Sequence, residues 1–191
     1  MTAVVTSAAA IGGAMSQPNE AWNRRKAAAR KYQPKRIRLL LVAESPPADE
    51  SRYFYFEDAE SAEPLFEEVC GVLFEDTPRP DKGASLKELR RRGVFLVDLK
   101  PDAPRRAEPL GPYWGPFMLN LGPLAPEKIV LLTVDVYDAL HSVMKKAGLP
   151  VVDLRIPFAP AGEQTHFRQK VRQALVRADL EKLIRPLPVP K

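Results

Sequence analysis

Four short aliphatic runs, separated by amphipathic segments, are the feature that most constrains how this chain can fold. The runs are "RIRLLLVA" (36–43), "GVFLVDL" (93–99), "EKIVLLTV" (127–134) and "PVVDLRIP" (150–157). A continuous aliphatic run is typical of a strand that is covered on both faces, as in a parallel sheet. The segments between the runs have helical character and would supply the covering layers. The sequence therefore predicts an α/β fold: a three-layer α/β/α sandwich with a central, mostly parallel four-stranded sheet.

One segment between the expected strands is predicted to be a loop, and others are predicted to be helices. The stretch from Lys100 to Pro126 is rich in proline, glycine and aromatic residues, so we expect a long ordered loop there. In the helix expected over 61–74, Ser61 is a plausible N-cap. Helices are expected over 21–32, 61–74, 135–148 and 165–178.

The chain length of 191 residues suits one domain with a substantial core. We expect a flexible N-terminal tail over 1–19, a single domain over 20–185 and a C-terminal tail over 186–191. No stretch approaches the ~20 apolar residues of a membrane span, and the N-terminus lacks the positive start of an export signal. The expectation is a cytoplasmic monomer without a membrane partner.

The supply of metal-binding side chains is small. The chain has one cysteine, Cys70, and two histidines, His141 and His166. These numbers exclude an internal disulfide framework and any all-cysteine zinc or iron–sulfur site. We expect no metal and no cofactor, and we expect Cys70 to be buried and inert.

The net charge of +5 is unevenly distributed. Eight Lys and Arg residues lie between 20 and 38 against one acid, twelve acids lie between 49 and 88 against four bases, and seven bases follow residue 164 against two acids. Basic ends around an acidic middle suit a polyanion such as nucleic acid. The alternative is that these charges are solvated helix faces.

Acidic residues end two of the predicted strands. Glu44 follows the first strand and Asp98 ends the second, and in a parallel sheet ligands bind beyond the carboxyl ends of the strands. The loop 157–165 follows the fourth strand, so all three sites should meet in one crevice. Pro46 and Pro47 stiffen the turn after Glu44, whose carboxylate could orient a water or stabilise a developing cation. Glu44 could equally be a helix cap or an ion-paired surface residue, and Asp98 could be paired with a neighbour rather than used for recognition.

Four consecutive aromatic residues, Tyr53 to Phe56, follow this turn. In an extended segment alternate side chains face opposite ways, so the four rings cannot all be core residues. Two rings would then be left for a wall or a stacking platform. The alternative is that the rings are simply packing and an exposed edge. Further along the chain, the step from Gly162 to His166 and Arg168 could bind a phosphate at a helix N-terminus, or could be a plain turn.

Four motifs, in order, resemble the uracil-DNA glycosylase superfamily. "AESPPADE" resembles its first motif, closest to the "GEAPG" version, with Glu44 at the glutamate of that motif. "GVFLVDLKP" resembles the second strand, with Asp98 at the position of an asparagine that recognises uracil. "PEKIVLLTVDVYDAL" resembles the third strand and its helix, and "IPFAPAGEQTHFRQKVRQAL" resembles the final, DNA-inserting motif. The similarity runs from about Arg36 to Ala178.

The resemblance implies a monofunctional DNA repair glycosylase of a divergent bacterial branch without the iron–sulfur cluster. Such an enzyme flips a damaged base, here expected to be uracil, out of single- or double-stranded DNA and hydrolyses its N-glycosidic bond. Glu44 would be catalytic. The residues implied in base binding are Ser45, Phe54, Tyr55, Phe56 and Asp98, and those implied in DNA binding are Pro160, Gly162, Gln164, His166 and Arg168.

The chain departs from the family pattern at several positions. Ala43 and Pro47 replace the outer residues of the first motif, and Ile156 replaces a histidine of the last one. An ionised Asp98 would repel a uracil carbonyl, whereas a protonated Asp98 could supply both a donor and an acceptor. Two alternatives therefore stay open: a non-catalytic nucleic-acid-binding protein on a glycosylase scaffold, and an enzyme that processes nucleosides or nucleotides.

Overall fold

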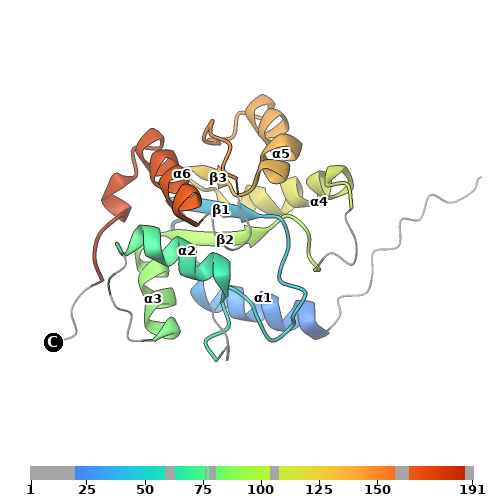
Figure 1. The fold of residues 1–191 in the computed structure, drawn as a ribbon. Helices are drawn as coiled ribbons and strands as arrows, with labels where there is room; N and C mark the ends of the chain where they lie inside the picture. Colours follow the sequence, from blue (N-terminus) through green and yellow to red (C-terminus); the bar gives the residue numbers. More distant parts are fainter. Residues whose placement is uncertain are drawn as a thin grey trace, which may run out of the picture.

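The chain is α/β, with helices and strands in alternation (Figure 1). The computed structural model describes residues 20–58, 63–75, 77, 81–103, 108–157 and 164–187. Its elements are α1 (Glu20–Tyr32), β1 (Leu39–Ala43), α2 (Pro64–Leu73), α3 (Lys82–Arg92), β2 (Val94–Asp98), α4 (Gly111–Leu121), η1 (Gly122–Leu124), β3 (Ile129–Leu131), α5 (Val134–Lys146), α6 (Gln164–Arg177) and η2 (Glu181–Leu183). Within these ranges no helix is long and apolar enough to cross a membrane. The expected tail 1–19 and most of the tail 186–191 lie outside the described residues.

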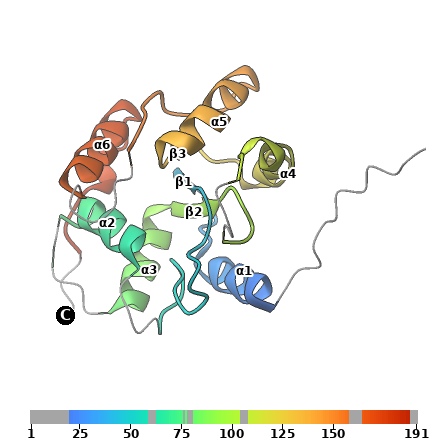
Figure 2. The ribbon, with the colours of Figure 1, turned by 45° about the vertical axis from the view of Figure 1, so that its right-hand side comes forward.

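The sheet has three parallel strands in the order β2-β1-β3. All five residues of the central strand β1 are buried. This position explains the unbroken aliphatic run, because neither face nor edge of β1 reaches solvent. Figures 1 and 2 show α1 and α3 on the β2 side of the sheet and α5 on the β3 side, with α2 and α6 side by side.

The expected strand over 150–157 is present in the described chain only as a single parallel bridge. Val151 pairs with Ile129 of β3. The Ile129 N–H donates to Pro150 O (2.9 Å), and the Val152 N–H donates to Ile129 O (2.8 Å). Beyond Val152 the chain leaves the sheet: the Leu154 N–H donates to Val152 O (3.0 Å), and the exposed Asp153 and Arg155 bind side chains of α5.

Two helices were missing from the sequence-based expectation. In α3, the Asp81 carboxylate accepts from the Ala84 N–H at 2.6 Å, and Gly93 ends the helix at φ 77°. A Cβ at Gly93 would lie 2.9 Å from Arg36 O, so glycine is required there by close approach as well as by φ. The helix α4 occupies part of the predicted loop 100–126, with Phe117 and Leu121 buried. Its glycines and prolines indicate a loop locally, but Pro112 lies in the first turn, where it is tolerated.

A buried arginine connects α3 with the C-terminal end of the described chain. The Arg92 side chain has no exposed surface. It donates to Glu88 Oε1 (2.6 Å) and to the backbone oxygens of Leu73 (2.7 Å), Leu183 (2.7 Å), Arg185 (3.0 Å) and Pro186 (3.1 Å). These bonds compensate the burial of the guanidinium and hold the segment after η2 against α2 and α3.

Candidate functional site

A cavity of about 450 Å³ lies where the three strands end. Glu44 follows β1, Asp98 ends β2, and Thr133 lies just after β3, and all three line the cavity. Ser45, Pro46 and Pro47 form the turn that borders it. Parallel strands place their carboxyl ends at one edge of the sheet, which is why residues this far apart in the sequence meet here.

Glu44 is bound to a buried lysine. Its Oε1 accepts a hydrogen bond from Lys100 Nζ at 3.1 Å, and its side chain keeps 32% exposure. The Lys100 N–H also donates to Glu44 O at 2.8 Å, just past the ends of β1 and β2. The alternative of an ion-paired glutamate is thus present in the structure, but at the wall of the cavity rather than on a convex surface.

Asp98 is a half-buried carboxyl group with an unusual proton affinity. Burial, together with the nearby negative charge of Glu63, raises its pKa from 3.8 to about 7, while Arg25 acts in the opposite direction. Asp98 can therefore hold its proton much closer to neutral pH than an ordinary aspartate does. The protonated form carries both a donor and an acceptor, and the ionised form carries acceptors only.

Glu63 also lines the cavity but is not among the site residues predicted from the sequence. It is the N-cap of α2, in place of the expected Ser61, which lies outside the described residues. Its carboxylate accepts from the N–H groups of Phe66 (2.6 Å) and Leu65 (3.1 Å). Burial raises the pKa of Glu63, and these two hydrogen bonds oppose the rise. The capping role could have been suspected from the acid placed directly before Pro64.

All four aromatic rings from Tyr53 to Phe56 are buried, so the expectation that two of them stay outside the core is wrong. The segment is a turn rather than an extended strand, as the bond from the Phe56 N–H to Tyr53 O (3.1 Å) shows. A turn directs successive side chains in several directions, so period-two alternation does not apply. Only Tyr53 and Phe54 of the four line the cavity.

Tyr55 and Phe56, which were predicted to contact the base, are placed elsewhere. The Tyr55 hydroxyl accepts from the Leu96 N–H (2.7 Å) and donates to Leu96 O (3.0 Å), on the outer edge of β2. It thereby satisfies backbone groups that an edge strand would leave unpaired. The guanidinium of Arg24 lies 4.4 Å from the centroid of the Phe56 ring. Phe54 is the remaining candidate for stacking among the three predicted residues.

Thr133 combines an unusual backbone with a place in the cavity wall. Its φ of 82° and ψ of 148° fall in a region that glycine occupies almost alone. Its hydroxyl accepts from the Val136 N–H at 3.3 Å and so caps α5. No sequence pattern could reveal this conformation, because threonine is an ordinary N-cap residue.

The residues predicted to bind DNA are only partly described. Pro160 and Gly162 lie outside the described residues, and Gln164 and His166 are exposed in the first turn of α6. Arg168 is not aimed at solvent: its Nε lies 2.6 Å from Oε2 of the largely buried Glu68 in α2. This ion pair joins α6 to α2, so the role of Arg168 is at least in part structural.

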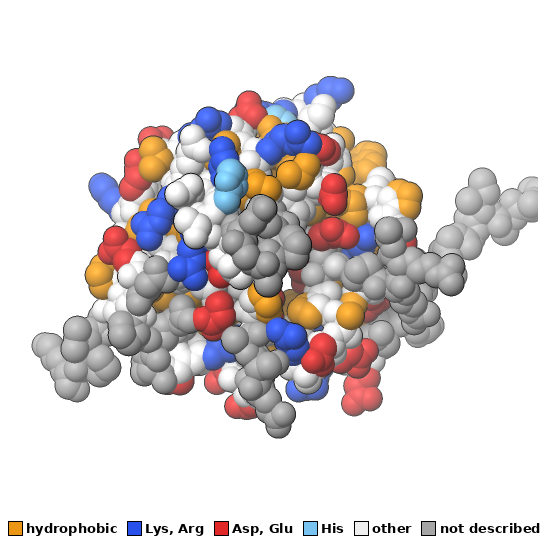
Figure 3. All heavy atoms as spheres, viewed as in Figure 1, with side chains coloured by type: hydrophobic (Ala, Val, Ile, Leu, Met, Phe, Trp, Pro, Cys, Tyr) orange, Lys and Arg blue, Asp and Glu red, His pale blue; other side chains and the backbone are white. Residues whose placement is uncertain are grey.

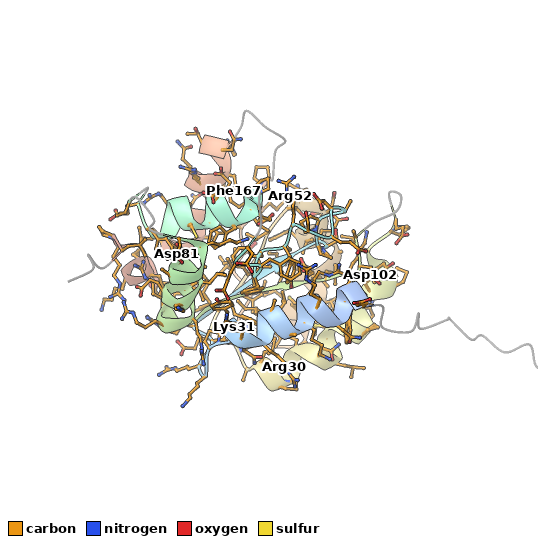
Figure 4. The ribbon with its side chains drawn as sticks, turned by 90° about the horizontal axis from the view of Figure 1, so that it is seen from below. Arg30, Lys31, Arg52, Asp81, Asp102 and Phe167 are labelled. Atoms are coloured by element: carbon orange, nitrogen blue, oxygen red, sulfur yellow. The ribbon has the colours of Figure 1, made fainter. Side chains whose placement is uncertain are left out.

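Three of the eight bases between residues 20 and 38 are paired with acids. Arg25 binds Asp102 at 2.9 Å, Lys31 is paired with Glu57, and Arg36 is paired with Glu127. Figure 4 shows Arg30 and Lys31 along α1, with Asp102 beside its N-terminal end. On the face drawn in Figure 3, Lys and Arg side chains are interspersed with Asp and Glu side chains.

The cavity lining offers carboxyl groups, aromatic rings, the hydroxyls of Ser45 and Thr133 and the guanidinium-bearing side chain of Arg52. In the ranges that the structure describes, no three His, Cys, Asp or Glu residues are grouped to hold a metal ion. Cys70 is buried, and burial raises the pKa of its thiol. Comparison of the chain with protein-family models, with curated proteins and with solved structures found no match.

Proposed function

We propose that this protein is a DNA repair glycosylase that flips a damaged base, with uracil as the leading candidate, into the cavity and hydrolyses its N-glycosidic bond to leave an abasic site. One observation carries the proposal: Glu44, Asp98 and the ring of Phe54 line the same cavity. Its volume falls within the ~300–1,000 Å³ typical of ligand sites. The resemblance to the uracil-DNA glycosylase superfamily is part of this proposal and rests on the order of the four motifs.

The roles follow from the chemistry of each group. The Glu44 carboxylate stabilises the cationic, oxocarbenium-like sugar and orients the attacking water. Protonated Asp98 donates to a carbonyl of the base and accepts from its adjacent N–H, as an asparagine amide would. Phe54 stacks on the base, and the N–H of Ser45 donates to a base oxygen, since Pro46 and Pro47 after it have no N–H to donate. No metal or cofactor is required for these steps.

Flipping a base costs a few kcal/mol, and least when the base is mispaired. We therefore expect the fastest release from single strands and from U·G pairs. We further propose that the protein acts as a monomer in the cytoplasm.

We also propose that the complete fold has four strands and three layers. A fourth strand would extend the sheet beyond β3 from the Ile129–Val151 bridge, and the helices would complete a three-layer α/β/α sandwich.

The test is base release from DNA. The protein is incubated with uracil in single strands and in U·A and U·G duplexes, and with T·G duplexes, and alkali-labile strand breaks are counted. Glu44→Gln should lower the rate of release strongly, to a residual rate that is followed with excess protein over long times. Glu127→Gln is the matched control, because Glu127 is also an ion-paired glutamate but lies outside the cavity. Intact DNA with excess parent protein would refute the proposal, and equal release by Glu44→Gln would remove Glu44 from the mechanism.

A second candidate, an enzyme acting on free nucleosides or nucleotides, is favoured by the neutralised basic segment. Three of its cations are bound to acids, which lowers the electrostatic attraction for a phosphate backbone. Free base released from deoxyuridine, measured by chromatography, together with DNA affinity that does not depend on salt, would favour this candidate. DNA affinity that falls steeply with added salt, without base release, would favour the non-catalytic binder.

A further inference from the structure

Lys100 is a buried cation directly behind the cavity wall. Its side chain has 2% exposure, and its ammonium lies 3.1 Å from Glu44 Oε1 and 3.5 Å from Glu108 O. The Tyr113 ring of α4 lies with its centroid 5.6 Å from Nζ. A buried charge requires a partner, because desolvation costs several kcal/mol per ion. Glu44 is the anionic partner of this lysine.

Lys100 holds Glu44 at two points. The Lys100 N–H donates to Glu44 O (2.8 Å), which fixes the backbone where β1 ends. The ammonium then fixes the direction of the carboxylate. A glutamate side chain has three rotatable bonds, so the backbone contact alone would leave the carboxylate free to sample several orientations.

The two members of the pair differ in exposure and in their relation to the cavity. The side-chain exposures are 2% for Lys100 and 32% for Glu44. Glu44 lines the cavity, and Lys100 does not. The ammonium therefore lies behind the carboxylate, and the contact of Lys100 with the cavity runs through Glu44.

We propose that Lys100 is a positioning residue that orients the Glu44 carboxylate toward the reacting sugar. The inference rests on the proposed glycosylase function and adds to it the residue on which the geometry of the carboxylate depends. Lys100 is itself supported by Glu108 and Tyr113, so the position of the N-terminal end of α4 is transmitted to Glu44. A surface ion pair would have little such effect, because both side chains would remain mobile in water.

A double-mutant cycle on the rate of base release tests this inference. Lys100→Met should lower the single-turnover rate by up to about 100-fold, the loss expected from a displaced catalytic group, and leave the Kd for uracil-containing DNA unchanged. In the Glu44→Gln background the same substitution should cause no further loss. Lys100→Arg should recover part of the rate. Equal losses in both backgrounds, or a raised Kd with an unchanged rate, would overturn the inference. If Lys100→Met does not fold, Lys100→Gln takes its place in the same cycle.

A second cycle separates failure of this inference from failure of the proposed function. If the parent protein releases no base, the glycosylase proposal fails. Urea unfolding of the parent, Lys100→Met, Glu44→Gln and the double variant then decides whether Lys100 and Glu44 are energetically coupled. Lys100→Met should change the equilibrium constant for unfolding of the parent protein. In the Glu44→Gln background the factor of this change should be at least about tenfold smaller. The control cycle is Arg36→Met with Glu127→Gln, an exposed pair whose effects should be nearly additive. Additive effects at Lys100 and Glu44 would overturn the inference regardless of activity.

Discussion

The raised pKa of Asp98 predicts a specific dependence of stability on pH. Below about pH 4 this carboxyl is protonated in both the folded and the unfolded chain, so its contribution to stability is fully present. Between about 4 and 7 the folded protein keeps a proton that the unfolded chain has released, so the free energy of unfolding falls as the pH rises. Above about pH 7 both states are ionised and the loss is complete.

The magnitude follows from the two pKa values. They are 3.8 in the unfolded chain and about 7 in the folded protein. Each pKa unit corresponds to ~1.4 kcal/mol, so the complete loss is at most about 4 kcal/mol. Such a loss is a large fraction of the ~5–15 kcal/mol that stabilises a typical domain. Asparagine does not titrate, so Asp98→Asn should not show this loss of stability.

The assay is urea unfolding of the parent and of Asp98→Asn across about pH 4.5 to 8.5. The stability of Asp98→Asn relative to the parent should increase with pH and level off above about pH 7. Glu63→Gln keeps an acceptor for the α2 amides but removes the charge, so it should lower the pKa of Asp98 and move the transition to lower pH. Glu127→Gln should leave the transition in place. A difference between parent and Asp98→Asn that is constant with pH would refute the reasoning.

Four further substitutions at three positions test other parts of the structure, each by urea unfolding. Tyr55→Phe should lower stability by about 1–3 kcal/mol, because two backbone groups of β2 lose their partner, and should leave base release unchanged. Arg92→Met should cost about 3–5 kcal/mol, since several buried carbonyl oxygens lose their donor. Thr133→Gly relieves the unfavourable backbone and should be at least as stable as the parent, whereas Thr133→Ala loses the cap and should cost about 1 kcal/mol.

The outcomes that would contradict these expectations are distinct. Loss of base release in Tyr55→Phe without unfolding would place Tyr55 in the reaction after all. Arg92→Met with parent stability would mean that water replaces the guanidinium at the carbonyl oxygens. A Thr133→Gly variant less stable than Thr133→Ala would show that the backbone at this position carries no strain.

The sequence was most informative where the pattern is local and repeated. The aliphatic runs predicted three strands that the structure contains, and parallel pairing placed Glu44 and Asp98 at the same edge of the sheet. The fourth run, 150–157, contains alternating charged residues and forms only a bridge; beyond it the Leu154 N–H donates to Val152 O, within the run itself, rather than to a neighbouring strand. The loop 100–126 was misjudged because glycine and proline have low helix propensity, whereas packing of Phe117 and Leu121 stabilises α4.

The sequence by itself determined the α/β class, the parallel sheet and the two acids at its edge, because strand burial and strand direction leave a periodic signal. Only the tertiary structure decided what surrounds those acids. Lys100 reaches Glu44 across 56 positions, Tyr55 reaches Leu96 across 41, and Arg168 reaches Glu68 across 100. Contacts of this kind depend on how separate elements pack, and each partner alone looks like an ordinary polar residue. The same packing buries Asp98 beside Glu63, and that proximity gives a common side chain an uncommon proton affinity.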